Sequence, residues 1–143
     1  RGLSELRVGQ LLRGLPRDEF VLSTKVGRIL RAPANPHAPV ASPQPGGLPF
    51  EVRFDYSRDG IMRAYEDCLQ RLGLTRIDLA IVHDLDLGYH APQARWDALM
   101  GQLITGGWQA LADHPLVGEA KLVGLMGSIA LTPDKATRAK FAS

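Results

Sequence analysis

The chain has 143 residues, of which 45% are hydrophobic and 22% charged, a composition typical of an ordinary folded globular protein. It carries 17 Lys and Arg against 15 Asp and Glu, a formal charge of +2. The basic residues are scattered along the sequence, so no charged patch for nucleic acid or a membrane is predicted, and small molecules are the expected partners. The single cysteine, Cys68, cannot form an internal disulfide, which fits a reducing, cytoplasmic compartment.

The first third of the chain predicts a helix, a strand and a long loop. Residues Ser4–Gly14 carry apolar residues at helical spacing, with Ser4 able to cap the start and Gly14 able to end the helix. Phe20–Val26 is a β-rich run of strand length. Residues 32–49 contain closely spaced prolines, which exclude a helix or a central strand. We therefore expect a long proline-rich loop that leaves the C-terminal end of the first strand.

The rest of the chain alternates between helix and strand signals. A helix is expected over Ser57–Leu72 with Gly73 after its end, followed by an almost unbroken apolar strand, Ile77–His83. A loop over Asp84–Pro92 leads to a helix that contains Trp96 and Trp108 and is interrupted by Gly106 and Gly107. A third strand is expected over Lys121–Met126, whereas residues 128–143 form an unassigned tail. Such alternation predicts an α/β chain with a parallel sheet.

Two side chains that can do chemistry come where predicted strands end. Lys25 lies at the end of the first strand and His83 at the end of the second. In parallel α/β architectures the reactive groups gather at these ends, because the loops that follow the strands converge there. We therefore expect an ammonium and an imidazole at the same rim of the sheet. From position alone, a solvated lysine and a structural histidine remain open for the two residues.

The residues around these two positions carry a family resemblance. Leu22–Arg28 and Arg71–Asp84 resemble the lysine and histidine strands of the aldo-keto reductases. Gly2–Gly9 resembles the helix after the family's catalytic tyrosine, and Phe54–Gly73 contains two stretches that look like its next helix. These four parts occur in the family's order over residues 1 to about 125. The proline-rich insertion and the acidic residues after His83 look most like the branch that oxidises sugars such as fucose or arabinose, or pyridoxal.

The resemblance implies a (β/α)8 barrel, of which about three strand-helix units would be present in one incomplete domain spanning 1–143. It implies hydride transfer between NADP or NAD and the carbonyl or hydroxyl carbon of a small aldose, aldehyde or pyridoxal-like substrate. Lys25 matches the family's lysine, which lowers the pKa of a tyrosine phenol, and His83 matches the histidine that orients the substrate oxygen. No cofactor-binding residue and no metal ligand is assigned.

The same resemblance leaves the catalytic set incomplete. The family's aspartate and tyrosine fall before Arg1, and neither Tyr56 nor Tyr65 replaces the tyrosine, since both are better interpreted as packing or edge residues. The missing initiator Met suggests that upstream sequence has been lost. By itself the chain is therefore expected to catalyse little, because loss of the acid-base residue reduces a rate by orders of magnitude.

Three other functions stay open. Lys25 could be the nucleophile of a Schiff-base lyase, if burial or a neighbouring charge lowers its pKa. His83, Asp84, Asp86 and His90 could form a metal-dependent hydrolase site, although their spacing matches no known ligand set. The chain could also be an inactive, truncated product that only associates with itself or with a complementary fragment, through an unpaired sheet edge.

Overall fold

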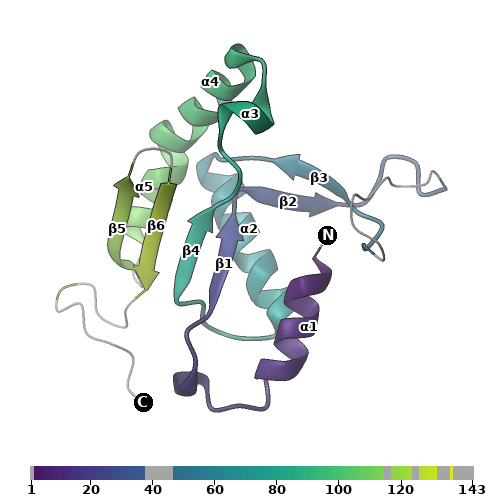
Figure 1. Cartoon of the computed structure of the whole chain (residues 1–143), viewed down its shortest axis with the longest axis vertical. Coiled ribbons are helices and arrows are strands. Elements are labelled where there is room, and N and C mark those ends of the chain that lie inside the picture. The colour runs from purple at the N-terminus through teal and green to yellow at the C-terminus, as the bar shows by residue number, and fades with distance from the viewer. Residues whose placement is uncertain (1, 38–46, 115–116, 124–125, 132–135, 137–143) are drawn as a thin grey trace.

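A computed structural model describes residues 2–37, 47–114, 117–123, 126–131 and 136. Figure 1 shows a twisted sheet with helices packed beside it and a separate hairpin at one end. The sheet has the strand order β1-β4-β6-β5, and the hairpin pairs β2 with β3. Within the described residues no helix combines the length and the apolar character needed to cross a membrane. The molecule is α/β, as predicted, and the described strands form an open sheet rather than a closed barrel.

Helix α1 (Leu3–Leu12) and strand β1 (Ser23–Val26) form close to the predicted places. A short 3-10 turn, Arg17–Glu19, joins them. Arg17 bridges this turn to the neighbouring strand region, since its guanidinium donates to the Asp78 carboxylate at 2.6 Å. The backbone N–H of Leu22 donates to the same carboxylate oxygen at 2.6 Å. The polar turn before β1 is thus tied to the segment before β4, which aligns the two strands.

Helix α2 (Arg58–Leu72) confirms the prediction over Ser57–Leu72 at both ends. The Ser57 hydroxyl accepts from the backbone N–H of Gly60 at the N-terminus, and Gly73 ends the helix in the left-handed conformation at φ 64°. One apolar face of the helix is buried, with Ile61, Tyr65, Cys68 and Leu72 in the core. Helix α2 packs against both β1 and α1.

Strand β4 (Leu79–Val82) runs parallel to β1, with Lys25 opposite Ile81 and Val26 opposite Val82. The pairing continues one residue further, since the backbone N–H of His83 donates to the Val26 carbonyl at 3.0 Å. This confirms the predicted parallel pair. It also brings the ends of both strands to the same edge of the sheet, which is the placement that the site requires.

The antiparallel hairpin β2 (Arg28–Arg31) and β3 (Glu51–Phe54) was not predicted. Each strand has only four residues, too few to give a clear alternation beside the prolines. The expected proline-rich loop connects these two strands, and its residues 38–46 lie outside the described part of the chain. The hairpin matters because it places Arg28 and Phe54 directly above the ends of β1 and β4.

The region after β4 is more helical than predicted. A short helix, α3 (Leu87–His90), forms inside the expected loop over 84–92. Helix α4 (Gln93–Gln102) continues through a π-helical turn, Leu103–Gly107, into α5 (Trp108–Asp113). The expected interruption at Gly106 and Gly107 is therefore a local change of helical pitch rather than a break. Gly107 lets the helix approach the carbonyl of Tyr56, which a Cβ would meet at 2.1 Å.

The predicted third parallel strand over Lys121–Met126 is wrong. Strands β5 (Val117–Val123) and β6 (Met126–Leu131) pair antiparallel with each other, and β6 pairs antiparallel with β4. Val123 pairs with Met126, so the chain reverses inside the apolar run that suggested one strand. An apolar run of this length does not reveal strand direction, and a parallel partner needs a crossover of a dozen residues or more. Of the tail over 128–143, which the sequence left unassigned, residues 128–131 lie in β6.

Candidate active site

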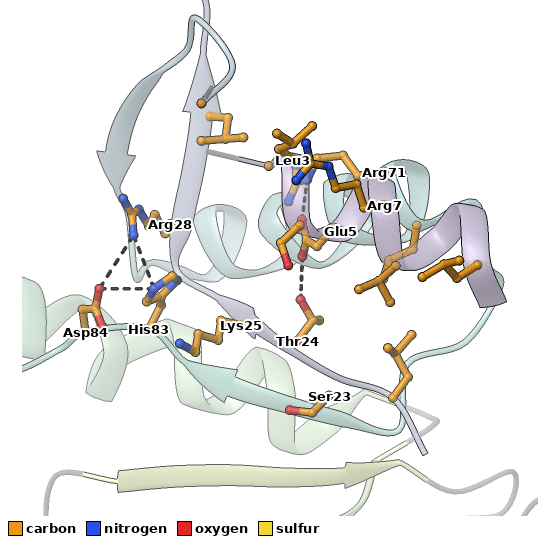
Figure 2. Close-up of a pocket in the computed structure, with 18 of the residues that line it drawn as sticks. Leu3, Glu5, Arg7, Ser23, Thr24, Lys25, Arg28, Arg71, His83 and Asp84 are labelled. Carbon is orange, nitrogen blue, oxygen red and sulfur yellow. Dashed lines mark hydrogen bonds and ion pairs between the residues drawn. The ribbon is translucent and has the colours of Figure 1, made fainter. Parts of the chain in front are cut away.

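Alternation along the two parallel strands decides which side chains reach the site. Thr24 and Val26 of β1 and Ala80 of β4 are buried toward the core. Since successive residues of a strand face opposite sides, Lys25, Ile81 and His83 share the other face. Figure 2 shows Lys25 and His83 next to each other on this face, where the two strands end. The structure therefore brings both predicted residues to one mouth.

A pocket of about 870 Å³ opens over these strand ends. Its volume lies within the usual range for small-molecule sites. It is lined by Lys25 and His83, by side chains of α1 and by residues of the hairpin and of α3, among them Glu5, Arg28, Asp84 and Tyr89. Both charges occur around the pocket, so it is suited to a polar ligand.

The position of His83 is fixed by a buried tyrosine. Tyr56 is fully buried, and its hydroxyl donates a short hydrogen bond to the main-chain carbonyl of His83. The Tyr56 oxygen also lies 3.2 Å from Nε2 of His90, which is fully buried as well. Burial, followed by the charge of Asp84, raises the pKa of Tyr56 well above its ordinary value. Tyr56 therefore stays protonated and acts as a hydrogen-bond donor that holds the end of β4.

The imidazole of His83 lies between a cation and an anion. Its Nε2 is 3.4 Å from Nη1 of Arg28 and 3.2 Å from Oδ2 of Asp84, and these two groups are 3.8 Å apart. Burial lowers the pKa of His83. Asp84 raises that pKa, while Arg28 and Lys25 lower it further. The net effect is a lowered pKa, so His83 is neutral at pH 7 and can donate a hydrogen bond to a substrate oxygen.

Asp84 has an unusual backbone conformation. It is the non-glycine residue with a positive φ, 49°, among those that the structure describes. Asp and Asn tolerate this left-handed region better than other residues do. The conformation turns the chain sharply after His83 and directs the Asp84 carboxylate back to the imidazole. Backbone outliers of this kind are concentrated at functional sites.

A second polar cluster supports the backbone at Lys25. Glu5 of α1 accepts a hydrogen bond from the Thr24 hydroxyl at 2.6 Å and pairs closely with Arg71 of α2. The Cys68 thiol donates to the Lys25 carbonyl at 3.6 Å. The cluster connects α1, α2 and β1 beside Lys25 and lines the same pocket (Figure 2). Lys25 itself is exposed, so its ammonium is available to a ligand in the pocket.

The geometry weighs against the metal-site interpretation. His90 is fully buried in an aromatic cluster, with its ring centroid 4.5 Å from that of Phe54, whereas Asp86 is exposed. Asp86 caps α3 by accepting from the backbone N–H of Tyr89 at 2.9 Å. In the described ranges no group of three or more His, Cys, Asp or Glu side chains is placed to hold a metal ion.

Sequence reasoning missed Arg28, Tyr56 and Glu5 as parts of the site. Tyr56 was correctly expected to be a packing residue, but its bond to His83 depends on a contact between residues 27 positions apart. Arg28 reaches the site because Gly27, at φ 91°, turns the chain from β1 into the hairpin. The glycine directly after a predicted strand was the available signal for that turn.

The chain is an α/β protein with a lysine and a histidine at the C-terminal ends of adjacent parallel strands, where the strands of α/β barrels carry their reactive groups. Comparison with protein families agrees, because residues 1–141 match the aldo/keto reductase family. The chain belongs to the aldo/keto reductase family, and the predicted family is thus confirmed.

Two of the similar proteins are dehydrogenases. The chain is 41% identical over 134 residues to a pyridoxal 4-dehydrogenase of Microbacterium luteolum, covering 87% of this chain and 38% of that enzyme. It is 43% identical over 93 residues to a D-threo-aldose 1-dehydrogenase of a Pseudomonas species, covering 58% of this chain and 26% of that enzyme. This chain thus spans well under half the length of both relatives.

A third similar protein matches only a short part of the chain and has another activity. Over 34 residues the chain is 56% identical to a putrescine–pyruvate aminotransferase of Pseudomonas aeruginosa, which covers 24% of this chain and 8% of that enzyme. A match of this length does not define a family. No solved structure matches the chain significantly.

Proposed function

We propose that the chain carries the lysine and histidine part of the active site of an NAD(P)-dependent oxidoreductase. The substrate would be a small aldose, aldehyde or pyridoxal-like compound, reacting at its carbonyl or hydroxyl carbon. One observation carries the proposal: Lys25 and His83 line a single pocket at the ends of adjacent parallel strands. The two dehydrogenases described above, which act on pyridoxal and on D-threo-aldoses, support the substrate class.

The chemistry of the two side chains fits a nicotinamide cofactor at this mouth. Hydride transfer to a carbonyl carbon leaves negative charge on its oxygen, and a cation with a neutral imidazole is the donor set that stabilises this charge. The nicotinamide ring supplies or accepts the hydride when it is bound. No residue of this chain is assigned to hold the rest of the dinucleotide.

Each side chain has a separate role in the proposal. His83, neutral at pH 7, hydrogen-bonds the substrate oxygen and fixes its orientation. Lys25 presents an ammonium that stabilises a neighbouring phenolate, lowering the pKa of a tyrosine that exchanges the proton. Tyr56 is not available for that exchange, since it is fully buried and donates to the His83 carbonyl, and Tyr65 is buried as well. The polypeptide alone is therefore proposed to bind substrate better than it turns substrate over.

The Schiff-base alternative is disfavoured by the exposure of Lys25, because a lysine nucleophile of that type needs burial or a neighbouring cation to be uncharged. One experiment separates the two functions. One sample of the protein is incubated with an aldose or pyridoxal and treated with borohydride. In a second sample, the binding of reduced nicotinamide is followed by its fluorescence. The redox proposal expects fluorescence quenching that weakens in Lys25→Met and His83→Ala but not in the exposed loop variant His37→Asn. A stable adduct on Lys25, without quenching, would establish the lyase instead.

A further inference from the structure

Arg28, His83 and Asp84 form a triangle whose members have more hydrogen-bond donors and acceptors than they use on one another. Its separations of 3.2 to 3.8 Å are at or beyond the upper limit of good hydrogen bonds. The side chains of Arg28, His83 and Asp84 are 25%, 19% and 34% exposed. They are thus partly shielded but still open to the pocket. A guanidinium has five N–H donors and a carboxylate about four acceptor positions, so both can take a ligand.

The hairpin and α3 hold this triangle rigidly. The Arg28 guanidinium lies over the Phe54 ring, 5.7 Å from its centroid, and Phe54 meets Tyr89 edge-on at 5.4 Å. The α3 backbone is fixed by its Asp86 cap at one end and by buried His90 at the other. Tyr89 is nevertheless 51% exposed and lines the same pocket. An aromatic side chain therefore lines the same pocket as the charged pair.

A pair of adjacent hydroxyl groups matches this surface. Each hydroxyl is both a donor and an acceptor, so a vicinal diol can donate to Asp84 while accepting from Arg28. The C–H faces of a sugar ring are apolar and can pack on Tyr89. An aromatic phenolate such as that of a pyridoxal-like compound would suit Arg28, but it would meet the Asp84 carboxylate as a like charge.

We propose that Arg28, Asp84 and Tyr89 form a subsite that recognises the vicinal C2 and C3 hydroxyl groups of an aldose whose reacting carbon, C1, lies at Lys25 and His83. The inference rests on the proposed function and narrows its substrate class to polyhydroxylated aldehydes. Arg28 and Asp84 determine specificity in this arrangement, and they also keep the His83 ring oriented until the ligand arrives.

The test measures sugar binding by NMR, following the backbone amide signals of residues 83–90. D-arabinose and L-arabinose are each compared with the 2-deoxyribose of the same series, which has the same C3 and C4 configuration and lacks the C2 hydroxyl. Pyridoxal is the third probe. In the unmodified protein, we expect at least one arabinose to bind about tenfold more tightly than its deoxy counterpart, because one hydrogen bond to a charged group is lost.

Variants assign that preference to the subsite. Arg28→Met and Asp84→Asn should each remove the preference for arabinose. Tyr89→Leu should weaken the binding of both arabinose and 2-deoxyribose. Asn tolerates the left-handed backbone at position 84, so Asp84→Asn removes the charge and keeps the turn. Arg53→Met is the matched control, since Arg53 makes a comparable 3.9 Å pair with Asp55 outside the pocket.

Equal affinity for arabinose and 2-deoxyribose in both series would overturn the inference. So would a preference that survives in Asp84→Asn, or tighter binding of pyridoxal that depends on Arg28. Failure of the proposed function would give a different result. In that case Lys25→Met would bind the sugars and pyridoxal as tightly as the unmodified protein does. If Lys25→Met weakens all three probes while the hydroxyl preference is absent, the redox proposal stands and the subsite does not.

Discussion

Replacing Gly27 by Ala should disturb both the core and the site. Gly27 has φ 91°, in the region where a side chain is strained, and joins β1 to the hairpin that carries Arg28. A Cβ at this position would lie 2.5 Å from two ring carbons of Tyr56. Tyr56 is fully buried and bonded to His83, so its ring cannot move aside without breaking that hydrogen bond.

The expected loss of stability combines two costs in the folded state with one smaller offset in the unfolded state. The positive φ costs about 1–2 kcal/mol for a residue with a Cβ. Overpacking against a fixed ring costs about 1–3 kcal/mol. Ala also reduces the freedom of the unfolded chain, which offsets about 0.4–1 kcal/mol. The free energy of unfolding should therefore fall by about 3 kcal/mol.

Urea denaturation of Gly27→Ala beside Gly14→Ala measures this loss. Gly14 has open space around its Cβ position and no positive φ, so it reports the unfolded-state effect alone. We expect Gly27→Ala to unfold at a much lower urea midpoint with an unchanged dependence on urea concentration. Gly14→Ala should unfold at a midpoint near that of the unmodified protein. If the two variants agreed within about 0.5 kcal/mol, the close approach of Gly27 to Tyr56 would be refuted.

Three further predictions concern buried polar groups. Tyr56→Phe should lower the free energy of unfolding by about 1–2 kcal/mol, seen in urea titration, because the His83 carbonyl loses its donor. Burial raises the pKa of Glu5, but its hydrogen bonds and the charge of Arg71 outweigh burial and lower it. The stability that ionised Glu5 contributes is present above its unfolded-state pKa and is lost as pH falls through the lower folded-state pKa. Glu5→Gln should therefore lower the free energy of unfolding at pH 7 by about 2 kcal/mol, and this difference should vanish on acidification. Equal free energies of unfolding at pH 7 would show that Glu5 is unpaired. Burial raises the pKa of Cys68 to about 12, so a thiol reagent should label it only at the rate of unfolding, and immediate labelling at pH 7 would contradict its placement.

The sequence was sufficient for the parts of the fold that depend on local signals. Ser57 and Gly73 specify the ends of α2 through capping chemistry that acts within a few residues. The apolar strand that ends at His83 has the composition of a strand covered on both faces. These two signals, with Lys25 at the end of β1, were enough to predict the shared mouth of the site.

The remaining features depend on contacts between distant segments. The reversal between Val123 and Met126 lies within an apolar run whose direction has no local signature. Arg28 and Asp84 meet at His83 only because one follows a glycine turn and the other adopts a positive φ. The contacts of Arg28 with His83 and Asp84 cannot be deduced from spacing, since each joins residues more than 50 positions apart.

The titration of His83 tests the central claim most directly, because it reports whether Lys25 is a close neighbour. Lys25 is one of the charges that lower the pKa of His83. NMR titration of the imidazole should therefore give a higher pKa in Lys25→Met than in the unmodified protein, and no change in the distant control Arg63→Met. An unchanged His83 pKa in Lys25→Met would show that the two side chains do not share one mouth, and would contradict the proposed site.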